Sequence, residues 1–502
     1  MKARTVGLAL AVLMAGCTVG PNYRRPVIPT PQSWKELPAS GVALGERGAL
    51  ARWWTTFRDP TLEALVARAV EENLDLKIAA ARVLEARAVH GIAASRALPQ
   101  VDASAAYSRA ERSDAIPPFN SAAGAPSPFG PRDQNIFQAG FDASWEIDVF
   151  GGVRRAKEAA LAQVQASQES QRDVLVTVVA EVARNYVELR GAQRRLEILD
   201  ATLVSQRDSR DLAQARFDAG LGSELDVTRA DGLLDTIESQ RPELERLARQ
   251  SFEALRVLIG GDLGALTPAL DTQRPIPPLP PQIPSVLPSE LLSRRPDLRS
   301  AERELAAATA RIGEATADLF PRFSITGSFG RLSEDYGNLG LGSAQFWTFL
   351  STVRWPIFAG GRLLANVRVQ EARRDQAYLQ YRKALLVAVE EVENALSTHV
   401  RERRREADLG SAVQANQRSL ELATERYTGG VESFLSVLDA QRSLYAAQDL
   451  QVQSESSAAT SLIALYKALG GGWEKDAGSS GPSARGALPP VASRSSERGS
   501  AR

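Results

Sequence analysis

The chain has 502 residues, in which 60 Lys plus Arg are balanced by 60 Asp plus Glu. Without a basic excess nothing points to a nucleic-acid partner, and mixed charges in such numbers are typical of solvated helix faces. One cysteine and two histidines, His90 and His399, are too few for a Cys/His metal site or for a nucleophile with its base. We therefore expect no enzyme, no catalytic or metal-binding residue and no cofactor.

The first residues are typical of a bacterial export signal. Lys2 and Arg4 precede a short apolar run, 6–15, which is too short to cross a bilayer as a helix. The run ends in Leu-Met-Ala-Gly before the only cysteine, Cys17. This order resembles the bacterial lipobox, in which the thiol is lipidated and the signal is then cut away. An ordinary signal peptide with an incidental cysteine is the alternative.

The lipobox predicts a lipoprotein signal peptide at 1–16, lipidation at Cys17 and a lipid-anchored N-terminal arm at 17–61. Several acyl chains on one cysteine are enough for stable anchoring. Thr18 stands where an aspartate would resemble a signal for retention in the inner membrane. We therefore expect the protein at the outer membrane.

Two blocks of the sequence repeat at fixed spacings, which indicates a tandem duplication. The pairs 222 positions apart include Asp75 and Asp297, Gly91 and Gly313, and Pro99 and Pro321; those 210 apart include Phe217 and Tyr427, Gly220 and Gly430, and Gly260 and Gly470. We predict a first repeat at 62–261 and a second at 289–471. A proline-rich linker, 262–288, would join them, and 472–502 would be a disordered tail.

Each predicted repeat consists of a helical stretch, two strands, a very long helix and a return helix. Pro99 and Pro321 end the first helical stretches, since proline cannot continue a helix. The helical stretches are 62–98 and 289–320, the strands about 100–109, 137–148, 322–331 and 346–357, the long helices 153–219 and 362–428, and the return helices 223–260 and 433–470. Pro242 falls inside the first return helix, where Val452 is its counterpart, so we expect a break in the first copy only.

The long helices contain no proline, and at 1.5 Å per residue each would be a rod of roughly 100 Å. No globular core is that wide, so such helices must pack side by side. Apolar residues in the first helix follow the alternating steps of four and three that are typical of a coiled coil: Leu175, Val179, Val182, Tyr186 and Leu189. A plain coiled-coil scaffold would fit this feature equally well.

The strand at 137–148 alternates apolar and polar residues over the length that a tilted transmembrane β-strand needs. Its counterpart, 346–357, repeats the pattern with Trp347, Phe349, Val353, Trp355 and Ile357. Four strands cannot close a barrel, and an open strand edge cannot lie in lipid. The chain must therefore pool strands with its own copies. Two copies give eight strands and three give twelve, and these patterns do not choose between them.

Several motifs resemble the lipoprotein branch of the TolC-type outer-membrane efflux factors, the NodT/RND efflux outer-membrane lipoprotein family. They are Gly20-Pro21-Asn22-Tyr23 after Cys17, Trp53-Trp54 with Asp59-Pro60, Arg294-Arg295-Pro296-Asp297-Leu298, and Arg426-Tyr427 with Leu438-Asp439-Ala440-Gln441. The resemblance implies a mainly α fold with membrane β. A homotrimer would form a twelve-stranded barrel in outer-membrane lipid that continues into a twelve-helix periplasmic barrel.

The family also implies the function: a passive exit duct for drugs or toxic metabolites in a tripartite efflux system. Its partners would be a periplasmic adaptor (membrane fusion) protein and an inner-membrane pump, usually of the resistance-nodulation-division class. A duct for protein (type I) secretion is the near alternative within this fold. A periplasmic coiled-coil scaffold lipoprotein that forms no channel is the more distant one.

Glycines mark the turns at the far ends of the long helices. Gly220 and Gly222 lie in one turn and Gly429 and Gly430 in the other, where we expect them to supply positive φ. Ser223-x-x-Asp226 resembles a capping box at the start of the next helix. Asp226 is therefore expected to be structural as well as near the tip.

Asp439 lies two turns into its helix, too deep for a cap. The resemblance places the matching acidic residue at the constricted periplasmic end, where three copies would form a ring of negative charge that favours cations. A solvated carboxylate facing the lumen is the alternative. Glu432 would add a second ring, and Tyr427 would either hold the closed tip by a hydrogen bond or simply pack. These residues form the predicted gate.

Overall fold

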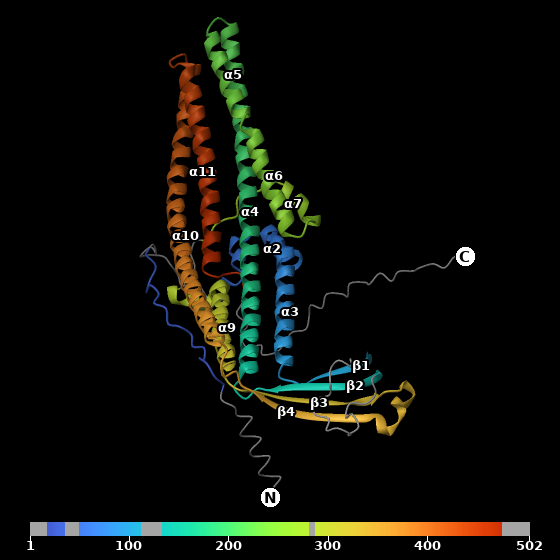
Figure 1. Cartoon of the computed structure of the whole chain (residues 1–502). Helices are drawn as coiled ribbons and strands as arrows, with labels where there is room; N and C mark the ends of the chain where they lie inside the picture. The colour runs from blue at the N-terminus through green and yellow to red at the C-terminus, as the bar shows by residue number, and fades with distance from the viewer. Residues whose placement is uncertain (1–17, 36–49, 112–132, 281–286, 474–502) are drawn as a thin grey trace, which may run out of the picture.

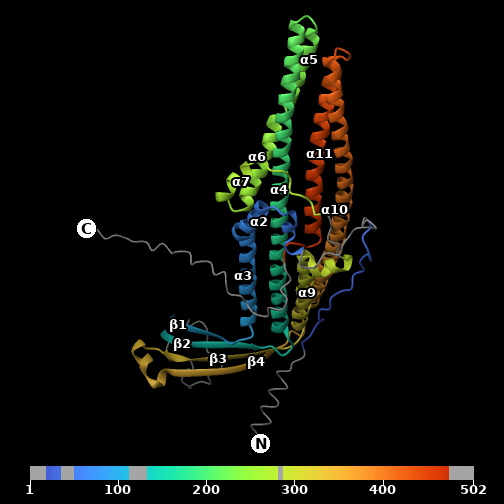
Figure 2. The ribbon, with the colours of Figure 1, turned by 180° about the vertical axis from the view of Figure 1, so that it is seen from behind.

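The structure is a computed structural model that describes residues 18–35, 50–111, 133–280 and 287–473. Its largest elements are α4 (Gly152–Asp218) and α10 (Arg362–Thr428), two helices of 67 residues that run along the length of the molecule (Figure 1). At one end the chain turns back, as α5 (Glu224–Glu238) and α6 (Arg241–Leu258) after α4 and as α11 (Phe434–Ala468) after α10. A sheet lies at the other end and extends sideways from the helices (Figure 2).

Shorter helices cover the half of the molecule nearest the sheet. They are α2 (Pro60–Glu72), α3 (Leu74–Ser95), α8 (Leu291–Arg294) and α9 (Pro296–Ala317). Short connecting turns of helix are η2 (Trp53–Phe57), η3 (Gly264–Leu266), α7 (Thr267–Asp271), η4 (Pro288–Glu290), η5 (Tyr336–Gly340) and η6 (Gly342–Ala344). Among the helices that the structure describes, none has the length and apolar character needed to cross a membrane.

The two helical stretches expected at 62–98 and 289–320 are each broken, so the prediction of continuous helices is wrong there. The breaks lie at Asn73 and Arg295, whose ψ angles of 130° and 120° leave the helical region. Pro296 explains the second break, because a proline disfavours helical backbone at the residue before it. At the first, the Asn73 side chain caps α3 by accepting from the Leu76 N–H at 3.0 Å.

The return helix of the first half is also broken, as Pro242 predicted. α5 ends at Glu238 and α6 begins at Arg241, so the proline occupies the second position of a new helix, where it forfeits no helical hydrogen bond. In the second half α11 continues through Val452 without interruption. The expectation of a break in the first copy only is confirmed.

Four antiparallel strands form one sheet in the order β1-β2-β3-β4. They are β1 (Gln100–Glu111), β2 (Asp133–Ile147), β3 (Arg322–Ser333) and β4 (Gln345–Arg354). The last strand was expected to reach 357 and ends earlier. Pro356 has no N–H to donate to the ladder, and Trp355 leaves it, with its indole Nε1 donating to the Leu319 carbonyl at 3.1 Å.

Pairing aligns the large apolar side chains on one face of the sheet. Phe141 lies opposite Phe329, and Phe329 opposite Trp347. The polar residues that alternate with the apolar ones along β2 belong to the other face: Gln138, Asp142, Ser144 and Glu146. A slip of one residue would exchange the faces, so the alternation fixes the register.

The same contacts recur at the two spacings seen in the sequence. The Asn73 side chain donates to the Leu258 carbonyl at 2.8 Å, and Arg295, 222 residues after Asn73, donates to the carbonyl of Ala468, 210 after Leu258, at 3.0 Å. Gly260 and Gly470 follow these carbonyls with φ of 83° and 73°. The two halves thus use equivalent positions with different side chains.

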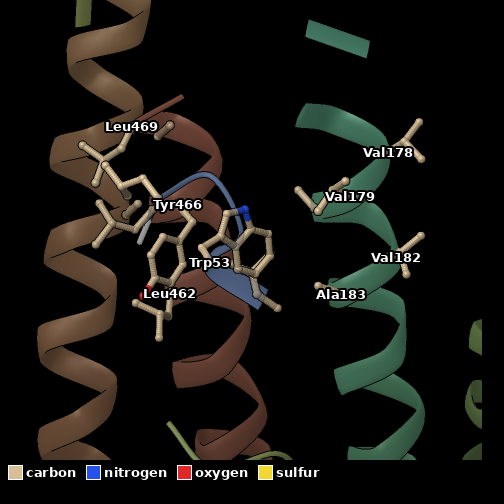
Figure 3. Close-up of a cluster of buried hydrophobic side chains, with 14 of the residues drawn as sticks. Trp53, Val178, Val179, Val182, Ala183, Leu462, Tyr466 and Leu469 are labelled. Carbon is tan, nitrogen blue, oxygen red and sulfur yellow. The ribbon is translucent and has the colours of Figure 1, made fainter. Parts of the chain in front are cut away.

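The largest core lies where α4 and α11 pass the short helices. Trp53 of η2 stacks on Tyr466 of α11 with ring centroids 5.0 Å apart and planes 11° apart. Figure 3 shows Val179 and Ala183 of α4 on the side of the helix that faces this pair. Because these side chains come from η2, α4 and α11, the core joins both halves of the chain.

Residues 18–35 form an arm that lies along α9 and α10. They are part of the segment predicted to be a lipid-anchored arm, 17–61. Arg155, 3% exposed, donates to the carbonyls of Val19 and Gly20 at 3.1 and 3.2 Å and to the Asn22 side chain at 2.8 Å. Gly20 has a φ of 85°, and a side chain there would overlap the backbone of Gly313. The Gly-Pro-Asn-Tyr motif therefore fits a contact that tolerates no Cβ.

Candidate gate at the ends of the long helices

Both turns at the far ends of the long helices have the same geometry. Gly220 and Gly430 each have a φ of 74°. The residue after each glycine donates back across the helix end: Leu221 to the Arg216 carbonyl at 2.8 Å and Val431 to the Arg426 carbonyl at 3.0 Å. This is a Schellman motif, which satisfies carbonyls that would otherwise lack a partner.

Gly222 and Gly429 do not supply positive φ, so that expectation is wrong for two of the four glycines. Gly429 has a φ of −72° and is the C-cap residue directly after α10. Gly222 is absent from the residues with positive φ among those described, and a Cβ there would lie 3.1 Å from the Phe217 nitrogen. A Schellman turn needs only one left-handed residue, which explains why one glycine of each pair suffices.

Tyr427 belongs to a small apolar cluster that joins the two helix ends. Its ring is buried and lies 5.0 Å from the ring of Phe434 at the start of α11. The rest of the cluster is Ala213, Val227, Ala230, Val437 and Leu438. Burial raises the pKa of the Tyr427 phenol, an effect that Arg216 opposes and Asp226 reinforces. Of the two roles predicted for Tyr427, packing describes the contacts found in this cluster.

Through this tyrosine, Arg216 links the two helical hairpins, one formed by α4 and α5 and the other by α10 and α11. Its guanidinium carbon lies 4.8 Å from the centre of the Tyr427 ring, and its Nη1 is 3.5 Å from the Thr428 carbonyl oxygen. A guanidinium over an aromatic face is attracted by the ring quadrupole. Arg216 thus connects the end of α4 to the end of α10.

Asp439 is exposed on α11 and pairs with a cation of its own helix. The Arg442 Nη2 lies 2.5 Å from the Asp439 Oδ1, and the two side chains are 69% and 52% exposed, respectively. A pair three residues apart on a helix surface contributes a few tenths of a kcal/mol. Each copy therefore places a carboxylate and a guanidinium together at this level, which reduces the net charge of any ring that Asp439 forms.

Glu432 is held in place beside the second turn. Its carboxylate accepts from the Ser436 hydroxyl at 3.0 Å and lies 3.6 Å from the Arg426 guanidinium. These partners come from both sides of the turn, α10 and α11. Glu432 thus combines a structural role at the helix start with a charge at the tip.

Asp226 does not complete the predicted capping box. The Ser223 hydroxyl accepts from the Leu225 N–H at 3.0 Å, and the N–H of Asp226 donates to the Ser223 carbonyl instead. Asp226 lies in the first turn of α5, where the positive end of the helix dipole stabilises a carboxylate. The helix start was identified correctly, but the side-chain exchange was not.

Two polar contacts fasten α4 to α11 below the tip. Arg195 forms a two-pronged ion pair with Asp449, at 2.6 and 3.1 Å. Closer to the turns, the Gln441 amide donates to the Ser209 hydroxyl at 2.7 Å. Contacts of this kind hold the hairpins at a fixed spacing near the predicted constriction.

The family model of the outer membrane efflux proteins matches residues 65–261 and 287–471. The chain belongs to this family. OprJ of Pseudomonas aeruginosa is 35% identical over 488 residues, which cover 93% of this chain and 95% of OprJ. The toluene efflux pump outer membrane protein TtgF of Pseudomonas putida is 33% identical over 485 residues, covering 94% and 98%. The outer-membrane channel OprN has a TM-score of 0.82 at 34% identity, over 91% of this chain and 100% of that one.

Membership of the outer membrane efflux protein family confirms the predicted resemblance and the predicted efflux function. The two matched segments contain all four strands and all the gate residues. Cys17, the predicted lipidation site, lies outside the described residues, as does the predicted tail beyond Trp473. The first described residue, Thr18, packs against Gly151 at the start of α4.

Arg442 and Arg216 are the residues at the tip that sequence reasoning missed. An Asp-x-x-Arg spacing on a helix was a usable signal for the first pair. No local sequence pattern predicts the contact of Arg216 with the Tyr427 ring, because the two residues are 211 positions apart (216 to 427). The repeat offered one indirect sign, since Arg216 and Arg426 are equivalent positions.

Proposed function

We propose that this chain is the outer-membrane duct of a tripartite efflux system and works as a lipid-anchored homotrimer. Three copies would pool twelve strands into a closed barrel in outer-membrane lipid, continued by twelve periplasmic helix rods. Small molecules such as drugs or toxic metabolites would pass through it without chemical change. The names of its relatives, which include toluene and antibiotic efflux pump components, support this substrate range over protein secretion.

The sheet supports closure with other copies. β1 and β4 are its two outer strands, so one edge of each has no neighbouring strand within the described chain. Large apolar residues on the sheet are exposed in one copy, among them Trp347, Phe349 and Phe141. In hydrocarbon an open edge costs several kcal/mol for each unpaired group, whereas an apolar outer face is favourable.

The gate is proposed at the ends of α4 and α10. Tyr427, Asp439, Glu432 and Asp226 all lie at or near the two turns, at the end farthest from the sheet. A periplasmic adaptor and an inner-membrane pump, of the resistance-nodulation-division class, would meet the duct at this end. The pump would supply the energy, and the duct itself would be passive.

Conductance of the purified protein in a planar bilayer tests the duct. Because a closed tip would block current, wild type is compared with the Arg216→Ala, Tyr427→Ala double variant, which removes the contact between the hairpins. We expect stepwise currents, larger in the variant. If neither protein conducts after insertion has been verified, the scaffold alternative replaces the duct.

A further inference from the structure

The two halves of the chain provide a template for the contact between neighbouring copies, a contact not present in one chain. We infer that β4 of one copy pairs with β1 of the next in a single register, in which Val353 lies opposite Ala105. The inference rests on the proposed trimer and adds the alignment of its strands and the chemistry of its helix contacts.

The strand register follows from the pairing of β2 with β3. That pairing joins the last strand of the first half to the first strand of the second half, and in it Ala143 lies opposite Gly327. Moving Ala143 by 210 positions gives Val353 on β4, and moving Gly327 back by 222 gives Ala105 on β1. The equivalent pairing between copies therefore places Val353 opposite Ala105.

The pairings inside the chain obey the same rule. β1 pairs with β2 so that Val101 opposes Ala143, and β3 pairs with β4 so that Phe323 opposes Val353. Val101 and Phe323 are 222 apart, and Ala143 and Val353 are 210 apart. Since the two strand pairs β1–β2 and β3–β4 share one register, we expect the two junctions, β2 with β3 inside a chain and β4 with β1 between copies, to share one register as well.

The register keeps the faces of the sheet aligned across the junction. Val353 and Ala105 belong to the apolar face, and so do the next pair on that face, Ser351 and Tyr107. The polar-face pair between them would be Thr352 and Ala106. A slip by one residue would direct polar residues of one copy towards the apolar face of the sheet, at a cost in lipid.

The helices above the strands extend the template. α9 packs against both α4 and α10, whereas α3, its counterpart, packs against α4. By the same offsets, the second neighbour of α3 is α10 of the preceding copy, the copy whose β4 pairs with β1. A Cβ on Gly152 would lie 3.1 Å from the Ala317 Cβ where α4 meets α9. The equivalent positions between copies are Arg362 on α10 and Ser95 on α3.

Two polar residues inside the chain have apolar counterparts between copies, whereas Arg299 has a cationic counterpart, Lys77. Within the chain, Arg299 of α9 pairs with Glu169 of α4 at 2.6 Å, and Ser300 donates to the Ala166 carbonyl at 3.0 Å. Leu379 is the counterpart of Glu169, and Ile78 that of Ser300; they are 59% and 49% exposed in a single copy. The exposed apolar residues of α3 and α10 are thereby explained as the surface that a second copy covers.

Cysteine pairs test the register directly, because Cys17 is the only native cysteine. Directly opposite residues in an antiparallel pair are roughly 5 Å apart, and a disulfide does not form beyond about 7 Å. We expect Val353→Cys with Ala105→Cys to form trimer-sized bands on non-reducing gels after oxidation. Val353→Cys with Tyr107→Cys, two residues out of register on the same face, should form them far more slowly.

Ala143→Cys with Gly327→Cys is the matched control, since it occupies the same register inside one chain and should close without changing the apparent mass. The single-cysteine variants measure background. Faster closure of the Tyr107 pair, or no closure of either pair while the control closes, overturns the register. If native mass spectrometry shows trimers in that case, only the register fails; a monomer would overturn the proposed function as well.

Discussion

The carboxylate of Asp439 and the guanidinium of Arg442 lie together on an exposed helix surface, so neither charge acts alone at the tip. If three copies surround an axis, the net charge at this level depends on which of the two groups lies closer to the lumen. Substituting each in turn separates their contributions.

The first prediction concerns ion selectivity. Asp439→Ala should lower the preference for cations and weaken block by divalent cations, because it removes the acidic ring and leaves the guanidiniums. Arg442→Ala should shift selectivity the opposite way. Reversal potentials in a salt gradient measure both, at low ionic strength where screening is weak. Identical values in wild type and both variants would show a solvated pair and no gate.

The second prediction concerns the arm. Gly20→Ala should displace residues 18–25, because its Cβ would overlap Gly313 and because a φ of 85° disfavours any side chain. Overpacking costs about 1–3 kcal/mol, so trypsin should cut after Arg24 roughly tenfold faster. Gly232→Ala, at a position with open space around it, is the control. Equal cleavage rates would mean that the arm is not held by this contact.

Sequence alone located the tip residues but not their partners. Asp439, Glu432 and Tyr427 were found because their motifs and their place beyond a glycine turn are local features. Arg216 over Tyr427 and Arg155 over the arm join positions more than 100 residues apart (216 to 427, 155 to 19). Contacts of that kind depend on how helices pack, which no single stretch of sequence encodes.

The helix turns give the third prediction. Gly430→Ala should destabilise the hairpin of α10 and α11 by about 1–2 kcal/mol, the cost of a left-handed conformation with a Cβ. Gly429→Ala should be neutral or stabilising by up to about 1 kcal/mol, because φ there is −72° and alanine restricts the unfolded chain. Thermal unfolding of the two variants in one detergent compares them. A larger loss for Gly429→Ala would contradict the assigned turn geometry.

Elements were predictable wherever one physical signal dominated. The absence of proline led to helices expected at 153–219 and 362–428, and α4 and α10 span Gly152–Asp218 and Arg362–Thr428. The breaks at Asn73 and Arg295 were missed although Pro296 and a capping asparagine marked them, because the prediction ended each stretch only at Pro99 and Pro321. The early end of β4 was signalled by Pro356 and overridden by the alternation of Trp355 and Ile357.

Assembly gives the fourth prediction. Native mass spectrometry in detergent should show trimers and no stable monomer, because a monomer would leave the edges of β1 and β4 unpaired in an apolar medium. Leu379→Arg, which adds a cation where the template places Lys77, the counterpart of Arg299, should weaken the trimer. Leu161→Arg, at another exposed leucine, is the control. A monodisperse wild-type monomer would exclude the proposed architecture.

At the scale of the whole molecule, the motifs and the repeat led to the family, but nothing in one chain's pattern chose between two copies and three. That choice depends on curvature, the angle that each repeat adds to a ring. Because each copy contributes four strands, the strand count requires only that the barrel contain a multiple of four. The packing of the helices then sets the number of copies.

Asn73 and Arg295 occupy equivalent places and reach equivalent carbonyls with different side chains. A ring built from six identical units would have to fold and assemble through one and the same surface, so every substitution would affect both processes. Joining two units in one polypeptide frees that surface to diverge. The contact inside one chain forms during folding, where charged side chains find partners at high local concentration. The contact between copies forms only when two molecules meet, and mutations can change its strength without affecting the contact inside the chain.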